Sequence, residues 1–282
     1  MTSFPASLIL DLDPIIVASP IIRSGTTLVQ RLLCSASNML IYGEHCGLDF
    51  QMYAGIALAK ATYYETQKER INADLAKVIE HNVNYWTAFL SPDADGYSHS
   101  LAASAGVPLQ YCREHAKSLN RPQWGFKVPG WPVATTELVR HCLPNAKWVV
   151  IHRDIDDCLK SAKAWQAPYY DDMKEMTENW AASLHYWLAH EHNPQVLLLN
   201  YHDLLADPAP ILKSLAEFTG ATTIDVNVLA VKVNDWLHET DKGPSQYRSP
   251  NELTAAEAAL VTPLDDLRHR LYGEKPSANS RP

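Results

Sequence analysis

One stretch near the start of this 282-residue chain combines an apolar strand, a tight turn and an apolar helix. Ile15 to Ala18 form a short apolar run of the kind that a parallel sheet buries on both faces. Apolar side chains then recur at helical spacing between Leu28 and Leu33. The turn between the strand and the helix is Arg23-Ser24-Gly25-Thr26-Thr27. A strand, a short turn and a helix in this order are the building unit of an α/β fold.

This turn has the chemistry of an anion site. Backbone N–H groups at a helix start have no partner within the helix, and the helix dipole adds positive potential there. Gly25 lets a phosphate approach the backbone closely, and Thr26 and Thr27 add hydroxyl donors. In the P-loop of nucleoside triphosphatases a lysine follows the second glycine, whereas here Arg23 precedes the glycine. An ordinary turn with a serine and threonine cap is the alternative interpretation.

A second candidate anion site lies at the end of a later strand. Arg153 follows a buried apolar run, Ser161 lies two turns into the next predicted helix, and Asp157 stands halfway between them. A guanidinium can bind a phosphate through two parallel hydrogen bonds, and a serine hydroxyl can donate from the side. A surface salt bridge between the arginine and a nearby aspartate is the alternative. Residues 152–154 also match the start of the kinase catalytic loop, but that loop needs an asparagine where Leu159 stands.

With both sites in place, the sequence resembles the sulfotransferases that use 3′-phosphoadenosine 5′-phosphosulfate (PAPS). The 5′-phosphosulfate loop of that family has Lys or Arg followed by Ser-Gly-Thr-Thr, as at residues 23–27. Its 3′-phosphate motif has the arginine, aspartate and serine of the second site at the same spacing. The arginine in the first loop is closer to the bacterial and tyrosylprotein-type branches than to the cytosolic branch, which has lysine. One difference is that Ile21 and Ile22 separate the proline of the loop from its arginine.

The resemblance also implies which residues act on the reacting groups. Lys127, in Trp-Gly-Phe-Lys-Val-Pro, is similar to the lysine of a Lys-x-Pro segment that contacts the sulfonate. Glu44 follows a glycine after the first predicted helix, where some branches have a glutamate as general base. His45 takes that role if the match shifts by one residue. An exposed lysine at a strand end and a glutamate that only caps a helix are the alternatives.

Three further residues are implied to bind the nucleotide. Tyr201, in Asn-Tyr-His-Asp-Leu, matches a tyrosine that often lies beside the nucleotide in the family, and a core aromatic is its alternative role. Lys242 and Arg248 belong to a C-terminal segment that folds over the nucleotide in family members. A solvated loop is the alternative for that segment.

Strand and helix signals alternate along the chain, which predicts a parallel sheet with helices on both faces. The predicted strands are residues 15–18, 39–42, 124–129, 147–152 and 196–201. A helical segment from about 48 to 123 separates the second and third strands, and we expect it to cap the sheet edge where ligands bind. The resemblance implies a three-layer P-loop α/β fold with about five central strands. We expect one domain over residues 1–282, with a disordered tail from about 274 to 282.

Charge and composition narrow the classes of partner. The net charge of −8 gives the chain no overall attraction for nucleic acid or an anionic membrane, so an anion site has to be local. No apolar run approaches a membrane span, and the N-terminus lacks the features of a signal peptide. Five scattered cysteines suit free thiols in a reducing compartment, so we expect a cytoplasmic protein. Neither ligand spacing nor a carboxylate cluster points to a metal.

Together these observations predict an enzyme that transfers the sulfuryl group of PAPS to a hydroxyl or amine of an acceptor. The reaction is an in-line displacement with a Glu or His general base and without a metal. A small-molecule alcohol or phenol is the preferred acceptor, because the acidic net charge disfavours a highly sulfated polysaccharide or an acidic peptide. A P-loop nucleotide kinase or NTPase and a non-catalytic nucleotide-binding protein are the alternatives. The oligomeric state is left open, with a homodimer as one option.

Overall fold

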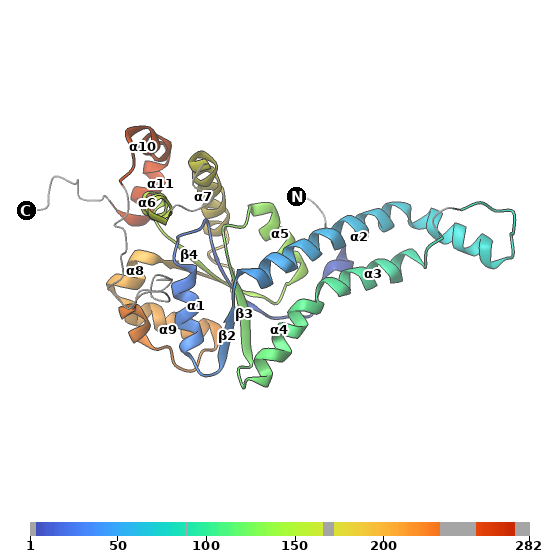
Figure 1. Ribbon diagram of the computed structural model, residues 1–282, viewed down its shortest axis with the longest axis horizontal. Helices are drawn as coiled ribbons and strands as arrows, with labels where there is room; N and C mark the ends of the chain where they lie inside the picture. The colour runs from blue at the N-terminus through green and yellow to red at the C-terminus, as the bar shows by residue number, and fades with distance from the viewer. Residues whose placement is uncertain (1–3, 88–89, 166–171, 232–251, 274–282) are drawn as a thin grey trace, which may run out of the picture.

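The fold is built around one five-stranded parallel sheet (Figure 1). The computed structural model describes residues 4–87, 90–165, 172–231 and 252–273. The strands are β1 (Ile15–Ser19), β2 (Met39–Tyr42), β3 (Gln123–Pro129), β4 (Lys147–His152) and β5 (Val196–Asn200). All five predicted strands are confirmed. The last strand ends one residue earlier than predicted, because Asn200 caps a helix that begins at Tyr201.

The strand order β2-β3-β1-β4-β5 puts β1 at the centre of the sheet. The chain builds β2 and β3 on one side of β1 and later β4 and β5 on the other, so the direction of winding reverses beside β1. Ligands of open α/β sheets bind at the carboxyl edge next to such a reversal. The register sets Val17 of β1 level with Lys127 of β3 and Val149 of β4. The ends of three central strands therefore meet at one edge.

Helices cover both faces of the sheet, as the sequence predicts. One face packs against α1 (Thr26–Ser35), α8 (Tyr201–Ala206) and α9 (Pro208–Thr219). The other face packs against α2 (Glu44–Ile79), α4 (Val107–Ser118), α5 (Val133–Cys142) and α7 (Met173–Leu188). A third cluster joins α7 to α6 (Ile155–Trp165), α10 (Ala255–Val261) and α11 (Asp265–Tyr272).

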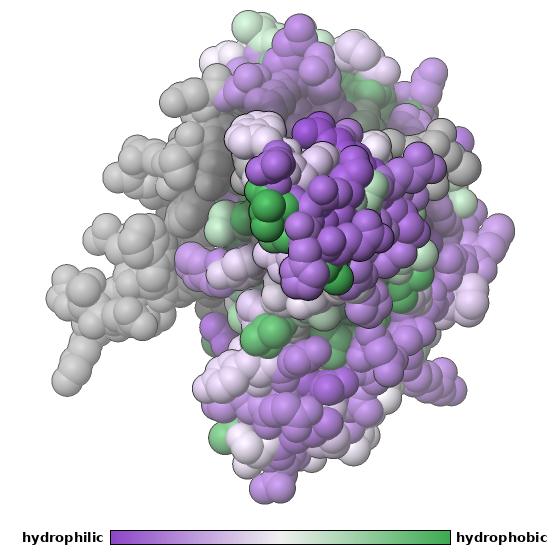
Figure 2. All heavy atoms as spheres, turned by 90° about the vertical axis from the view of Figure 1, so that its right-hand side faces the viewer, coloured by the Kyte–Doolittle hydropathy of each residue, from purple (hydrophilic) through white to green (hydrophobic). Residues whose placement is uncertain are grey.

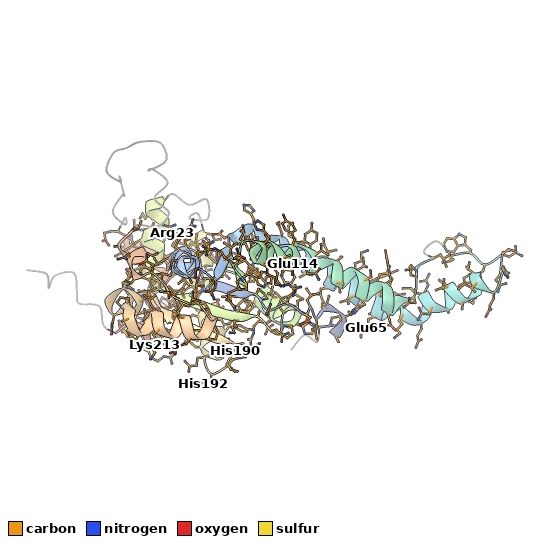
Figure 3. The ribbon with its side chains drawn as sticks, turned by 90° about the horizontal axis from the view of Figure 1, so that it is seen from below. Arg23, Glu65, Glu114, His190, His192 and Lys213 are labelled. Carbon is orange, nitrogen blue, oxygen red and sulfur yellow. The ribbon has the colours of Figure 1, made fainter. Side chains whose placement is uncertain are left out.

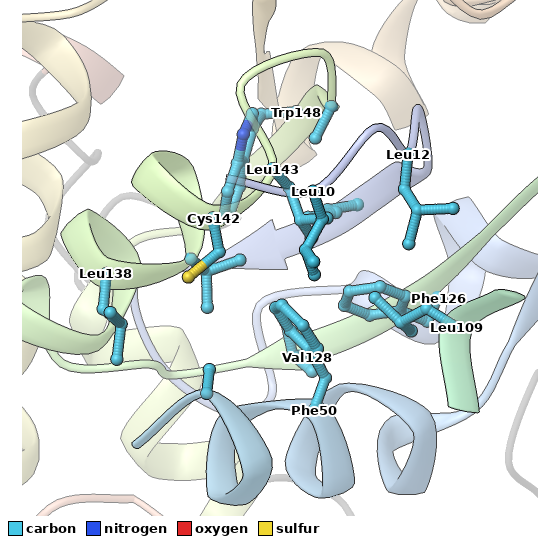
Figure 4. Close-up of a cluster of buried hydrophobic side chains, with 14 of the residues drawn as sticks. Leu10, Leu12, Phe50, Leu109, Phe126, Val128, Leu138, Cys142, Leu143 and Trp148 are labelled. Atoms are coloured by element: carbon cyan, nitrogen blue, oxygen red, sulfur yellow. The ribbon is translucent and has the colours of Figure 1, made fainter. Parts of the chain in front are cut away.

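The core beneath α2 fixes the position of that helix on the sheet. In Figure 4, the side chains of Phe50, Phe126, Val128 and Trp148 converge from α2, β3 and β4. All four side chains are almost completely buried. Burial of such a side chain stabilises the folded state by about 1.5–3 kcal/mol. The N-terminal part of α2, which begins at the sheet edge, is therefore held firmly.

The predicted helical segment forms a long arm. Its helices are α2, α3 (Ala94–Ala105) and α4, so the segment begins at Glu44 and its last helix ends at Ser118. Beyond the N-terminal part of α2, the α2–α3 hairpin projects away from the sheet (Figure 1). Most of this segment therefore does not cover the sheet edge, in contrast to the expected cap. Seen from the arm side, the surface is mainly hydrophilic with small apolar patches (Figure 2).

Three of the expectations concern residues outside the described ranges. They are the disordered tail from 274 to 282 and the nucleotide contacts of Lys242 and Arg248. In the described part of the chain, no helix has both the length and the apolar character needed to cross a membrane.

Candidate active site

Ile21 anchors the turn between β1 and α1 in the core. Its side chain is only 4% exposed and belongs to the apolar cluster that contains Cys158 of α6. Its carbonyl oxygen accepts hydrogen bonds from the hydroxyls of Ser19 (2.7 Å) and Ser24 (2.9 Å). The isoleucine pair that distinguishes this turn from the family pattern is therefore packed against α6. The Ser24 hydroxyl holds the turn in shape from inside.

Arg23 has a left-handed backbone conformation, with φ at 66°. This conformation is uncommon for a residue other than glycine and costs on the order of 1 kcal/mol, so its surroundings must fix it. Its Nε donates to the Ser161 hydroxyl at 3.2 Å, and Nη1 of Arg153 donates to the Arg23 carbonyl oxygen at 3.4 Å. The two predicted anion motifs are thus in direct contact. In Figure 3, Arg23 lies at the opposite edge of the molecule from His190 and His192.

Gly25 is required by both its backbone and its neighbour. Its φ is 108°, and a Cβ atom there would lie 2.7 Å from Cδ2 of Tyr201. Helix α1 begins at the next residue, Thr26, and no described side chain caps this helix start. The first N–H groups of α1 therefore have no side-chain acceptor within the described part of the protein, which is the condition for anion binding.

Tyr201 lies between the two anion motifs. One side of its ring contacts Gly25, and the Arg153 guanidinium lies 4.5 Å from the ring centroid. This distance permits a cation–π interaction, which holds the guanidinium plane over the ring. Tyr201 is therefore brought to the site that the sequence predicts for it, although it lies in the first turn of α8 and not at the end of β5.

Arg153 at the end of β4 has an unsatisfied donor. Its Nε atom is buried and has no hydrogen-bond partner among the described residues. The nearest ion-pair contact of this atom is Oδ2 of Asp157, at 4.0 Å. The Arg153 carbonyl oxygen is held by Nε1 of Trp180 at 3.0 Å, so the backbone is fixed. Because a buried donor without an acceptor is unfavourable, this guanidinium is suited to receive an anion.

His202 is a member of this cluster that the sequence analysis missed. Its Nε2 lies 3.1 Å from Oδ2 of Asp157, the same oxygen that faces Arg153. The Nε2 atom is buried and makes no properly oriented hydrogen bond with a described residue. The ring packs edge-on against Tyr201 and Tyr272. Its position next to Tyr201 was the only available signal, and the sequence does not tell which way the ring points.

Helix α11 supports the turn that carries Arg153. The Arg268 guanidinium donates to both oxygens of the buried Asp154 carboxylate, at 2.8 and 3.1 Å. The Tyr272 hydroxyl lies 2.8 Å from Nδ1 of His152. Burial, with a smaller effect of His202, lowers the pKa of His152 to about 4, so its ring is neutral near pH 7. These contacts join the C-terminal helix to the 3′ side of the site.

Lys127 is a buried lysine and not an exposed residue at a strand end. It is 9% exposed, and its side chain leaves β3 on the face that α1 covers. Its Nζ donates to the Thr27 hydroxyl at 3.0 Å and to Oε1 of Glu44 at 2.6 Å. The ammonium thus links the anion-binding turn to the first residue of α2. This places a cation and a carboxylate beside the predicted 5′ site.

Glu44 and His45 differ in their surroundings. The Glu44 side chain is 45% exposed and reaches the Lys127 ammonium. His45 is exposed and makes no hydrogen bond or ion pair with any residue that the structure describes. The geometry therefore favours Glu44 of the two candidate bases. Within the described ranges, no group of three or more His, Cys, Asp or Glu side chains could hold a metal ion.

Comparison with protein families gives one clear match. The model described as "Sulfotransferase family" matches residues 14–225, which is well over half of the chain. The chain belongs to the sulfotransferase family. The family predicted from the two anion motifs is confirmed, and the match does not distinguish its branches. A search of curated proteins found no match.

Solved structures that match the chain include three sulfotransferase-type proteins. They are the sulfotransferase domain from the Synechococcus PCC 7002 olefin synthase (15% identity, 94% of this chain and 98% of that chain covered, TM-score 0.49), mouse sulfotransferase SULT7A1 complexed with PAP (12%, 95% and 88%, 0.47), and retinol dehydratase in complex with androsterone and the inactive cofactor PAP (17%, 95% and 84%, 0.46).

Proposed function

We propose that this protein transfers the sulfuryl group of PAPS to a hydroxyl or amine of a small-molecule acceptor. One observation carries the proposal. Arg23 of the first anion motif donates to Ser161 of the second, so both motifs belong to a single site at the carboxyl edge of the sheet. A donor with a 5′-phosphosulfate and a separate 3′-phosphate requires two such groups of donors.

The residues present fit this donor. The uncapped start of α1 offers backbone N–H groups to the 5′-phosphosulfate, with Arg23 and Thr27 beside them. The buried and unpaired Nε of Arg153 supports binding of the 3′-phosphate, with Ser161 as its neighbour. Tyr201 separates the two motifs and presents an aromatic ring to the same region. PAPS supplies the sulfuryl group, and these side chains bind and orient it.

The chemistry needs charge stabilisation and a base. Lys127 is positioned to stabilise negative charge that develops near Thr27 during transfer. Glu44, which is half-exposed at the end of this network, is positioned to accept the proton of the acceptor hydroxyl. Holding both groups on rigid elements fixes the geometry of an in-line displacement. We propose that neither step requires a metal.

Two alternatives stand against this proposal. A P-loop kinase or NTPase needs a lysine after the glycine of the loop, and Thr26 occupies that position. A protein that binds the nucleotide without catalysis would not need a buried lysine paired with a carboxylate. Lys127 and Glu44 therefore favour an enzyme.

Nucleotide binding tests the donor. Titration calorimetry and thermal shift should detect adenosine 3′,5′-bisphosphate but not ATP with Mg²⁺, because a ligand of the native state raises its melting temperature. Arg153→Ala should weaken this binding, and Arg113→Ala, which removes a cation on α4, should not. Stabilisation by ATP alone would refute the proposal. Sulfate transfer from labelled PAPS to a panel of alcohols, phenols and amines then identifies the acceptor class.

A further inference from the structure

We propose that His202 is a positioning residue that controls how Arg153 binds the 3′-phosphate. When His202 is protonated, it pairs with Asp157 and leaves the Arg153 guanidinium available for the phosphate. When His202 is neutral, Asp157 has Arg153 as its counter-ion and competes with the phosphate. Binding of a 3′-phosphorylated nucleotide should therefore strengthen as His202 becomes protonated. This inference rests on the proposed function.

The geometry behind this inference is a carboxylate shared by two cations. Oδ2 of Asp157 lies 3.1 Å from Nε2 of His202 and 4.0 Å from Nε of Arg153. Both nitrogen atoms are buried, and neither has a hydrogen-bond partner among the described residues. Neither contact is thus an optimised structural salt bridge. An arrangement with two unsatisfied donors around one carboxylate is instead suited to change partners when an anion arrives.

The other groups around His202 do not compensate for its charge. From β4, His152 faces it, and the pKa of His152 is lowered to about 4 by burial, so this ring is neutral above pH 6. From α11, Tyr272 faces it, and burial raises the pKa of this phenol, which stays neutral. On its own helix, Tyr201 presents an uncharged ring edge. The charged neighbours in contact with this cluster are Asp157 of α6 and Arg153.

Two properties make His202 suited to this control. A histidine changes charge near neutral pH, whereas Arg153 keeps its charge at every pH of interest. The His202 side chain is 41% exposed, so protons reach the ring, while Nε2 is directed inward at Asp157. A change in protonation is thereby transmitted to the carboxylate and from it to the guanidinium.

The test compares two nucleotides by titration calorimetry at pH 6.0 and 8.0. Adenosine 3′,5′-bisphosphate carries the 3′-phosphate, and adenosine 5′-phosphate lacks it. In the wild-type protein, the affinity ratio of the two should be about tenfold larger at pH 6.0, since hydrogen bonds to charged groups are worth this much. The phosphates also titrate near pH 6. This effect belongs to the ligand and cancels when each variant is compared with the wild type at the same pH.

Three variants separate the roles. His202→Gln should keep the ratio at the low value of the wild type at pH 8.0. His202→Lys, which has a permanent charge, should restore a high ratio at both pH values, and Asp157→Asn should do the same by removing the competing carboxylate. His99→Gln, at an exposed position of the α3 arm, is the control and should behave like the wild type.

The outcomes distinguish this inference from the proposed function. If the wild type and His202→Gln bind the bisphosphate with the same pH dependence, His202 does not control the site, although the donor assignment stands. If neither protein binds the bisphosphate at either pH, the donor assignment itself is wrong and the inference falls with it. A high ratio for His202→Lys at pH 8.0 would support the control by charge.

Discussion

Lys127 and Glu44, which are 83 residues apart in the sequence, form an ion pair of 2.6 Å at the carboxyl edge of the sheet. The lysine side chain is 11% exposed and the glutamate side chain 45%. The cation is therefore fixed inside the protein, and the carboxylate stands at the surface where an acceptor can reach it. A general base must lie within hydrogen-bond reach of its substrate, and a charge-stabilising group works best when it is preorganised.

Removing either member of this pair should lower turnover and leave nucleotide binding nearly intact. Glu44→Gln removes the base, and Lys127→Met removes the charge, so each should reduce kcat by about 10²–10³ in a sulfate-transfer assay. Glu114→Gln removes the partner of an exposed 3.0 Å ion pair with Lys117 and should leave kcat unchanged.

His45→Gln decides between the two candidate bases. This variant should retain the kcat of the wild type, because His45 is exposed and outside the ion-pair network. Loss of activity in His45→Gln together with full activity in Glu44→Gln would exchange their roles. Circular dichroism of each variant checks that the fold is kept.

Gly47→Ala should reduce activity by moving the start of α2. A Cβ atom at Gly47 would lie 2.2 Å from Cγ1 of Val128, so α2 must shift away from β3. This shift should lower the free energy of unfolding by about 1–3 kcal/mol, as overpacking does. Because Glu44 lies one turn earlier on the same helix, kcat should fall by at least about tenfold.

Gly55→Ala is the matched control on the same helix. No atom lies within 4 Å of a Cβ placed there, so the substitution should raise the free energy of unfolding by about 0.5–1 kcal/mol through helix propensity. Its kcat should equal that of the wild type. Equal activity of both alanine variants would show that the close packing at Gly47 does not position Glu44.

The sequence was sufficient to predict the sheet and both anion motifs, because each depends on residues close together in the chain. The apolar strands and the turn at 23–27 carry local signals. The carboxyl ends of parallel strands share one edge, so Arg153 and Lys127 were expected near that turn. The contact between Arg23 and Ser161 follows from the same topology, and its atomic detail does not.

The rest of the site depends on side-chain directions that only the three-dimensional packing fixes. His202 follows Tyr201 in the sequence, but its contact with Asp157 depends on how α8 lies against α6. The burial of Lys127 follows from the face on which it leaves β3, which the residues around it do not reveal. The arm was expected to cover the sheet, whereas its apolar residues pack mainly between its own helices and at its base.

Cys46 should be the most reactive of the cysteines in the described part of the chain. The thiol of Cys112, with its sulfur 3.7 Å away, lowers the pKa of Cys46 to about 7 by hydrogen bonding to the thiolate. Iodoacetamide should therefore alkylate Cys46 with a midpoint near pH 7, as followed by peptide mass spectrometry. Burial raises the pKa of both Cys142 and Cys158 to about 12, so these should not react in the folded protein.

Cys112→Ala tests the cause of this reactivity. Without the hydrogen bond, the alkylation midpoint of Cys46 should rise toward the ordinary thiol value of about 8.5. A wild-type midpoint already at that value would contradict the prediction, as would a midpoint that does not move in the variant.

His152 should make the folded state less stable in acid. Its pKa is about 4 in the folded protein because burial disfavours the charged ring, and it is about 6.5 in an unfolded chain. Between these values the unfolded state binds more protons, so the free energy of unfolding rises with pH. The contribution of His152 is complete above pH 6.5 and is lost as the pH falls toward 4, by about 3 kcal/mol in total.

Urea unfolding of the wild type and His152→Asn at pH 7.5, 6.0 and 5.0 measures this contribution. Asparagine does not titrate, so the stability of the wild type relative to the variant should decrease as the pH falls. His99→Asn, at an exposed position, should show the same pH dependence as the wild type. Parallel curves for the wild type and His152→Asn would mean that the ring is already charged in the folded protein, which would remove the neutral neighbour that the control of Arg153 by His202 requires.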